Sequence, residues 1–226
     1  MSAMLTQPTL DTHKAPKQGR FISFEGTEGV GKTTAIDALC TRLQAADIHY
    51  LRTREPGGSP FAEHLRTLLL DPETDISDDT ELLLLFAARC DHLQDVIMPA
   101  LQRGDWVICD RFTDSTIAYQ GFGRAHGDTT VLMKIEALIT QFIPRLPELT
   151  LWLDLPVREG MARAGKRSAA DRFEQEAHPF FTRVHEGFAR LAAEHPQRIR
   201  RIDASGSGDE VSARIWQALD SQFESI

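Results

Sequence analysis

The stretch from Gly26 to Thr33, GTEGVGKT, has the residue types and spacing of a loop that holds phosphate groups. It fits the pattern G-x-x-x-x-G-K-[ST] in full, in which the glycines let backbone N–H groups converge on phosphate oxygens. Lys32 then reaches the β and γ phosphates, and the hydroxyl of Thr33 binds Mg²⁺. We expect the nucleotide donor to be held by Gly26, Thr27, Glu28, Gly29, Val30, Gly31, Lys32, Thr33 and Thr34.

The chain contains no asparagine, and this absence narrows the class of nucleotide enzyme. A GTPase reads guanine with a motif that contains asparagine, and a protein kinase uses an asparagine of its catalytic loop to hold magnesium. Both classes are therefore excluded, and we expect ATP with Mg²⁺ to be the phosphoryl donor.

A second segment, WVICDR at residues 106–111, is an apolar run that ends in an acid and a base. At the end of a strand, Asp110 can hold Mg²⁺ through water, opposite Thr33. The guanidinium of Arg111 can form paired hydrogen bonds to a second phosphate group. The alternative is a surface ion pair that caps the strand. Together the two motifs predict phosphoryl transfer from ATP to an acceptor that carries its own phosphate.

The elements that must position these motifs alternate between strand and helix. Short apolar, often β-branched runs predict strands at Phe21–Glu25, Ile48–Thr53, Trp106–Asp110, Leu149–Leu155 and Ile199–Ile202. Helical patterns lie between them, near 32–46, 59–70, 79–102, 130–142, 177–194 and 209–223. This alternation predicts a three-layer α/β/α fold of the P-loop NTPase class, with a five-stranded parallel sheet and helices on both faces. Ligands then bind at the carboxyl ends of the strands.

Length and composition limit the protein to one domain and exclude several classes of partner. The 226 residues suit one sizeable α/β domain, which we expect over 20–226, after a disordered tail at 1–19. The longest apolar run, Leu82–Ala88, is far too short to cross a membrane. The net charge of −8 disfavours nucleic acid as a partner. The three cysteines are odd in number and widely spaced, which favours a reducing cytoplasm.

Five motifs, in this order, resemble thymidylate kinases of the bacterial type: FEGTEGVGKTT, TREPGGSPFAEHLR, LLLLFAAR, CDRFTDSTIAYQG and ADRFEQE. The likeness runs from about residue 20 to the C-terminus. It implies transfer of the ATP γ-phosphate to dTMP, giving dTDP for dTTP and DNA synthesis. It also implies a homodimer formed through the helices near 79–102 and 130–142.

The resemblance assigns roles to individual residues on the acceptor side. Arg111 grips the phosphate of dTMP, and Arg89 reaches the base carbonyl. Tyr119 packs near the sugar and makes a 2′-OH unwelcome. Glu28, an acid inside a cradle for anions, faces away from the donor phosphates and binds the sugar 3′-OH. The expected dTMP-binding residues are Glu28, Arg54, Glu55, Arg66, Leu85, Phe86, Arg89, Arg111, Ser115, Thr116, Tyr119 and Gln120, with Thr116 and Gln120 reading the thymine edge.

Other interpretations of these residues stay open at this point. Glu28 can be a helix N-terminal acid favoured by the helix dipole. Tyr119 can be core packing, and Arg54 and Arg66 can be solvated surface charges. The family usually places a phenylalanine four residues before the pocket arginine, whereas here Leu85 occupies that position and Phe86 follows. Both positions neighbour Arg89 on a helix, so either side chain can cover the base.

A lid is expected near 160–175, because the phosphate loop has no arginine and the transferring oxygens need further positive charge. The segment 162–172 is basic and rich in small residues, which suits a mobile lid over ATP; the alternative is a solvated basic helix. We expect Arg167, then Arg163, to supply the cation, and the run Asp171, Arg172 and Glu174 to anchor the lid. The expected catalytic residues are therefore Lys32, Arg111, Arg163, Arg167 and Glu28.

Two other functions remain compatible with the sequence. One is a P-loop kinase that phosphorylates a different nucleoside monophosphate, such as dUMP or a purine nucleotide. The other is a non-catalytic switch that binds ATP, whose signature is loss of the lid cations or of the Asp110–Arg111 pair. This chain keeps both features.

Overall fold

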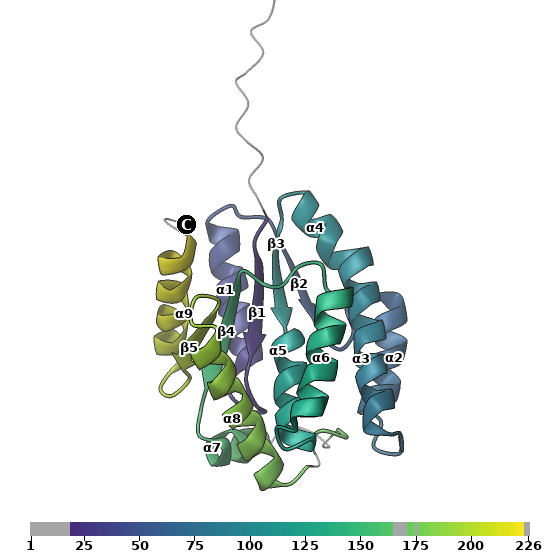
Figure 1. The fold of residues 1–226 in the computed structure, drawn as a ribbon. Coiled ribbons are helices and arrows are strands. Elements are labelled where there is room, and N and C mark those ends of the chain that lie inside the picture. Colours follow the sequence, from purple (N-terminus) through teal and green to yellow (C-terminus); the bar gives the residue numbers. More distant parts are fainter. Residues whose placement is uncertain (1–18, 165–170, 175, 224–226) are drawn as a thin grey trace, which may run out of the picture.

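A parallel sheet forms the centre of the computed structural model, which describes residues 19–164, 171–174 and 176–223 (Figure 1). Its five strands lie in the order β2-β3-β1-β4-β5. They are β1 (Phe21–Glu25), β2 (Tyr50–Arg54), β3 (Trp106–Asp110), β4 (Leu149–Asp154) and β5 (Ile199–Asp203). The predicted fold class is confirmed, and the strands begin and end within two residues of their predicted positions. The predicted tail at 1–19 lies, except for Gly19, outside the described residues.

Helices cover both faces of the sheet (Figure 1). They are α1 (Lys32–Ala45), α2 (Pro60–Leu70), α3 (Asp78–His92), α4 (Met98–Gln102), α5 (Thr113–Thr116), α6 (Thr129–Phe142), α7 (Val157–Ala164), α8 (His178–Glu194) and α9 (Gly208–Phe223). One face packs against α1 and α9, and the other against α3, α4, α6 and α8. No helix in the described ranges is long and apolar enough to span a membrane.

The register of the central strands fixes where the two phosphate-binding motifs meet. Phe24 of β1 lies opposite Asp110 of β3, and Arg54 of β2 lies opposite the same aspartate. The phosphate loop therefore leaves β1 beside the point where the Asp-Arg motif leaves β3. Parallel strands place both motifs at one edge of the sheet, where ligands bind in folds of this kind.

The phosphate loop also touches the backbone of α7. Gly29 has a φ of 72°, and a Cβ atom there would lie 1.9 Å from the carbonyl oxygen of Gly160. A Cβ atom on Gly160 would lie 2.5 Å from the carbonyl oxygen of Glu28. Two glycines therefore let the loop and the helix approach without side chains between them.

The predicted helix at 79–102 is confirmed, with an interruption. A π-helical turn, η1 (Leu93–Ile97), separates α3 from α4. Pro99 lies in the first turn of α4, directly after this π-helical turn. The helix α3 carries Leu85 and Arg89, which were predicted to bind dTMP.

The helical segment at 113–124 is absent from the sequence prediction. It consists of α5 followed by a π-helical segment, η2 (Ile117–Arg124). Its threonines and its two glycines are weak helix formers, so periodicity alone does not reveal it. Packing against α8 stabilises it: a Cβ atom on Gly123 would lie 2.6 Å from the ring of Phe180. This segment carries four residues predicted to bind dTMP: Ser115, Thr116, Tyr119 and Gln120.

We predict that Gly123→Ala destabilises the protein by about 1–3 kcal/mol, because Phe180 is buried and cannot move aside freely. Urea unfolding of both proteins measures the difference. Gly208→Ala is the matched control, since the nearest atom to its new methyl group is a Thr34 side-chain carbon at 4.0 Å. Equal unfolding midpoints for the two variants would contradict this account of how η2 is held.

Candidate active site

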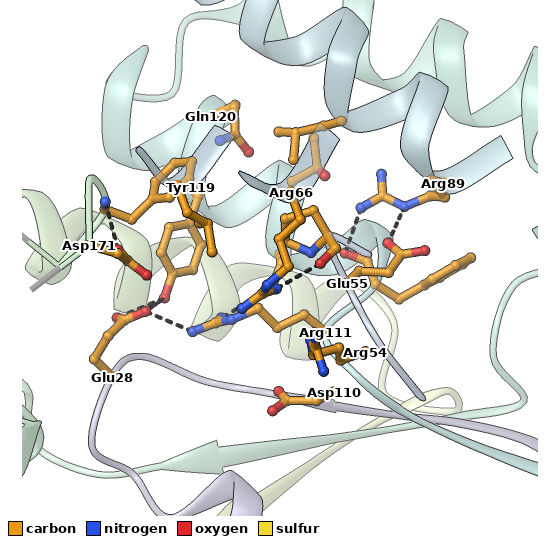
Figure 2. A pocket seen from close by; sticks show the side chains of 17 residues that line it. Glu28, Arg54, Glu55, Arg66, Arg89, Asp110, Arg111, Tyr119, Gln120 and Asp171 are labelled. Carbon is orange, nitrogen blue, oxygen red and sulfur yellow. Dashed lines mark hydrogen bonds and ion pairs between the residues drawn. The ribbon is translucent and has the colours of Figure 1, made fainter. Parts of the chain in front are cut away.

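A cavity opens at the carboxyl ends of β1, β2 and β3 (Figure 2). Its wall includes every residue predicted to bind dTMP except Phe86, and Asp110 as well. The structure adds residues that the sequence analysis did not assign to the site: Pro56, Leu70, Phe112, Asp171 and Phe173. The cavity thus joins the end of the phosphate loop to the Asp-Arg motif and to α3.

Arg111 lies at the centre of the site and pairs with the acid of the phosphate loop. Its Nη2 donates to Oε1 of Glu28 at 2.8 Å, and its Nη1 donates to the carbonyl oxygen of Gly26 at 2.9 Å. The residue has a φ of 70°, which is uncommon for a residue other than glycine and which turns its side chain back over the loop. Glu28 points toward Arg111 and Tyr119 (Figure 2).

Tyr119 packs in the hydrophobic core and also lines the cavity. Its ring lies at about 6 Å, edge to face, from the rings of Phe180 and Phe188, and its hydroxyl donates to both oxygens of Glu28 at 2.9 Å. Burial raises the pKa of Tyr119 well above its usual range, so the hydroxyl keeps its proton as a donor. Core packing and a role at the sugar are therefore compatible for this residue.

The charge of Arg111 is secured by its surroundings. Burial alone would lower the pKa of this guanidinium, but the anionic groups around it, which include Glu28 and Asp110, raise the pKa above its ordinary value. An obligate cation on the wall of a cavity can bind an anion such as a phosphate group.

Arg89 lies on the cavity wall and is held by its neighbours (Figure 2). It is only 3% exposed, and its Nε donates to Oε2 of Glu55 at 2.6 Å. Its Nη2 donates to the carbonyl oxygen of Phe112 at 3.2 Å, whereas its Nη1 is buried and has no partner among the described residues. His92 contacts the other oxygen of Glu55 at 3.1 Å and thereby fixes the acid. Glu55 and Phe112 therefore restrict the guanidinium of Arg89 to few orientations.

Of the two candidates to cover a base, Leu85 lines the cavity and Phe86 does not. Of the two alternatives, this geometry favours Leu85 as the side chain that faces a bound base. Its side chain is buried in the core between α3 and the sheet, and the guanidinium of Arg89 lies 5.2 Å from its ring. Phe86 therefore supports Arg89 from the side opposite the cavity.

Arg54 and Arg66 lie on the cavity wall, and each forms a hydrogen bond to another protein group. Arg54 is half-exposed and donates to Oε2 of Glu63 at 2.9 Å. Arg66 donates to the carbonyl oxygen of Pro56 at 2.7 Å, and burial followed by the nearby Arg54 lowers its pKa. Both guanidinium groups add positive charge beside Asp110.

The phosphate loop forms the part of the site that is expected to bind the nucleotide donor. Lys32 lies across it and donates from Nζ to the carbonyl oxygens of Gly26 and Thr27, at 3.2 Å each. Burial and the nearby Arg111 lower the pKa of Lys32. Thr33 and Thr34 begin α1 with exposed side chains. The loop, the N-terminus of α1 and Lys32 thus lie together, an arrangement that suits anion binding.

A model of the thymidylate kinase family matches residues 24–215 of the chain. The chain belongs to the thymidylate kinase family. The thymidylate kinase of Psychrobacter sp. (strain PRwf-1) is 68% identical over 205 residues, which cover 91% of this chain and 99% of that protein. The thymidylate kinase of Alkalilimnicola ehrlichii is 51% identical over 208 residues, which cover 90% of this chain and 94% of that protein.

A solved thymidylate kinase structure, from Ehrlichia chaffeensis, has the same fold. It aligns with a TM-score of 0.71 and 32% identity, and covers 89% of this chain and 98% of that one. The resemblance inferred from the five motifs is thereby confirmed, and the chain is a phosphotransferase. The non-catalytic switch is set aside.

The predicted lid lies partly outside the described residues. Arg167 and Lys166 fall in the gap at 165–170, and Arg163 is exposed on α7, 3.9 Å from Glu159. Beyond the gap, Asp171 and Phe173 reach the cavity wall. The amides of Phe173 and Glu174 donate to Oδ1 of Asp171 at 2.9 Å, which fixes this turn. The lid-anchoring role given to the Asp171 run remains a prediction.

Glu25 is a site residue that the sequence analysis missed. It is the last residue of β1, directly before the phosphate loop, and it is fully buried. Its two oxygens accept from the amide of Phe112 at 2.7 Å and from the hydroxyl of Ser115 at 2.5 Å. Burial, followed by the charge of Asp114, raises its pKa to about 8. An acid at the end of a buried strand was the available signal.

We predict that Glu25 makes the free energy of unfolding fall as pH rises from 4.5, its ordinary pKa, to about 8. In this range the folded state keeps a proton that the unfolded state has released, so the slope from this group is at most about 1.4 kcal/mol per pH unit. Glu25→Gln removes the titration, so its stability relative to wild type should increase with pH. Denaturant unfolding at several pH values tests this, and parallel curves for both proteins would refute it.

Proposed function

We propose that this chain transfers the γ-phosphate of ATP to dTMP and so supplies dTDP for dTTP and DNA synthesis. The observation that carries the proposal is the cavity with two arginines on its wall. Arg111, beside the phosphate loop, suits the phosphate of a monophosphate, and Arg89, on α3, suits a base carbonyl. Thymine carries such a carbonyl, and membership of the thymidylate kinase family supports the assignment.

On the donor side, the chain's own contribution is positioning. The amides of residues 26–34 and Nζ of Lys32 hold the β and γ phosphates in line with the acceptor, and closure of the site excludes water. The phosphate of dTMP is already ionised, so the chain needs no general base. Positioning and charge stabilisation then account for the rate.

The residues present fit a magnesium ion beside the loop. Oδ1 of Asp110 is buried and, within the described ranges, has no hydrogen-bond partner, so it can accept from a metal-bound water. The hydroxyl of Thr33 offers a second oxygen. Among the described residues no cluster of three or more acidic, histidine or cysteine side chains could hold a metal alone, which agrees with an ion held mainly by phosphates and water. Bound Mg²⁺ would neutralise charge on the phosphates.

On the acceptor side, Glu28 and Tyr119 act on the sugar. Oε2 of Glu28 accepts from the hydroxyl of Tyr119, whereas Oε1 accepts from both Tyr119 and Arg111, so Oε2 keeps capacity for a sugar 3′-OH. Tyr119 closes the wall near the 2′ carbon. Thr116, Ser115, Glu55 and Leu85 complete the pocket, with Gln120 at the base edge.

The assembly and compartment are part of the proposal. Large exposed apolar side chains occur on α3 and α6, including Leu83 at 58% and Met133 at 65% exposure. Exposed apolar groups on these two helices support a homodimer formed through them. We also propose a cytoplasmic enzyme that binds no nucleic acid, in line with the net charge of −8.

A panel of acceptors tests the function against its nearest rival, a kinase of another monophosphate. ADP release is measured with dTMP, dUMP, dCMP and AMP. The proposal expects dTMP to have the highest kcat/KM. A higher kcat/KM for any other acceptor would overturn the assignment of dTMP while leaving the phosphotransferase class intact.

We predict that Arg111→Ala raises the KM for dTMP by roughly 10- to 100-fold, because a charged hydrogen-bond donor to the phosphate is lost. The KM for ATP should change far less. Steady-state kinetics with each substrate varied in turn provides the measurement. Arg103→Ala is the matched control, since Arg103 is exposed and precedes β3 at its opposite end. A larger effect on ATP than on dTMP would contradict the assigned role.

We predict that Arg167→Ala lowers kcat by at least about a hundredfold and leaves dTMP binding without ATP nearly unchanged. The phosphate loop has no arginine, so the segment after α7 must bring the cation that stabilises the transferring oxygens. Arg163→Ala tests the second candidate in the same assay. Near-normal kcat in both variants would place the catalytic cation elsewhere.

A further inference from the structure

A fully buried glutamate on α3 joins the base end of the cavity to the segment that follows the gap at 165–170. Glu81 has 0% exposure, and three side chains donate to it. Oε1 accepts from Nε2 of Gln120 at 2.9 Å and from Nε of Arg124 at 3.0 Å. Oε2 accepts from Nη1 of Arg172.

The chemistry of Glu81 fixes which way Gln120 points. A carboxylate paired with two guanidinium groups can only accept hydrogen bonds. Gln120 must therefore turn its amide NH₂ group toward Glu81, because its carbonyl oxygen would meet another acceptor there. This leaves Oε1 as the side-chain atom that Gln120 can offer to the cavity that it lines.

The cavity wall then presents an acceptor to a pyrimidine edge. This acceptor is Oε1 of Gln120. A thymine ring has the matching donor, its N3–H group. A cytosine ring has an acceptor at N3, so it would bring two acceptors together and leave the carbonyl oxygen of Gln120 unpaired.

We propose that Glu81 is a positioning residue that makes the site specific for thymine-type over cytosine-type bases. It does so by holding Gln120 with its carbonyl oxygen toward the base. This inference rests on the proposed function, since it names what selects the base of the same acceptor. It goes beyond that function because Glu81 itself lies outside the cavity wall.

The test is the ratio of kcat/KM for dTMP to that for dCMP. In Glu81→Gln the side chain at position 81 can donate as well as accept, so Gln120 is free to turn over. We expect the ratio to fall at least about tenfold, mainly through KM. Glu194→Gln is the matched control, because it removes an exposed ion pair with Arg190 on α8. The control should keep the wild-type ratio.

A double variant provides the rescue. In Glu81→Gln with Gln120→Glu, the donor and the acceptor exchange places and the net charge is preserved. The new carboxylate at position 120 again presents only acceptor oxygens to the cavity, so the ratio should return toward the wild-type value. A general loosening of the fold would lower kcat/KM for both nucleotides and leave the ratio unchanged.

Gln120→Met keeps the inference testable if Glu81→Gln does not fold, since it leaves Glu81 its two arginine partners. It should also lower the ratio about tenfold. An unchanged ratio in either Glu81→Gln or Gln120→Met overturns the inference. Failure of the wild-type protein to phosphorylate dTMP overturns the proposed function instead, so the two failures are distinct.

Discussion

The register between β1 and β3 sets Phe24 opposite Asp110, and the charged groups of the site take their positions from that alignment. It brings the start of the phosphate loop beside the Asp-Arg motif. The amide of Arg111 donates to the carbonyl oxygen of Phe24 at 2.9 Å, and this bond fixes the turn in which Arg111 adopts its positive φ. A shift of one residue would turn the side chains of β3 to the other face and separate Arg111 from Glu28.

Three buried glutamates organise the groups that face a ligand. Glu25 holds the turn that carries Ser115, Glu55 holds Arg89, and Glu81 holds Gln120. Each is at most 5% exposed and accepts two or more hydrogen bonds from other elements. A buried carboxylate that is fully hydrogen-bonded restricts its partners to few orientations. These three glutamates therefore help to fix the side chains that line the cavity.

The sequence predicted what depends on local pattern, and it missed what depends on packing between distant segments. The phosphate loop and the five strands follow from spacing and apolar runs, so they were predictable. The helix at 113–124 was not, because Gly121 and Gly123 disfavour a helix until α6 and α8 pack against them. Whether Leu85 or Phe86 faces the cavity depends on how α3 is rotated about its axis. The sequence does not define this rotation, because both positions neighbour Arg89 on a helix. Glu25 was missed although an acid ends the apolar run of β1, because its partners, Phe112 and Ser115, lie far away in the sequence.

Gly29 of the phosphate loop packs directly against the backbone of Gly160 in α7. Backbone meets backbone there, with no side chain that could change rotamer and absorb a displacement. A shift of α7 along its axis must therefore push directly on the peptide group of Glu28, the residue that contacts Arg111 and Tyr119. The position of α7 and the position of the Glu28 carboxylate on the cavity wall are therefore coupled through the backbone.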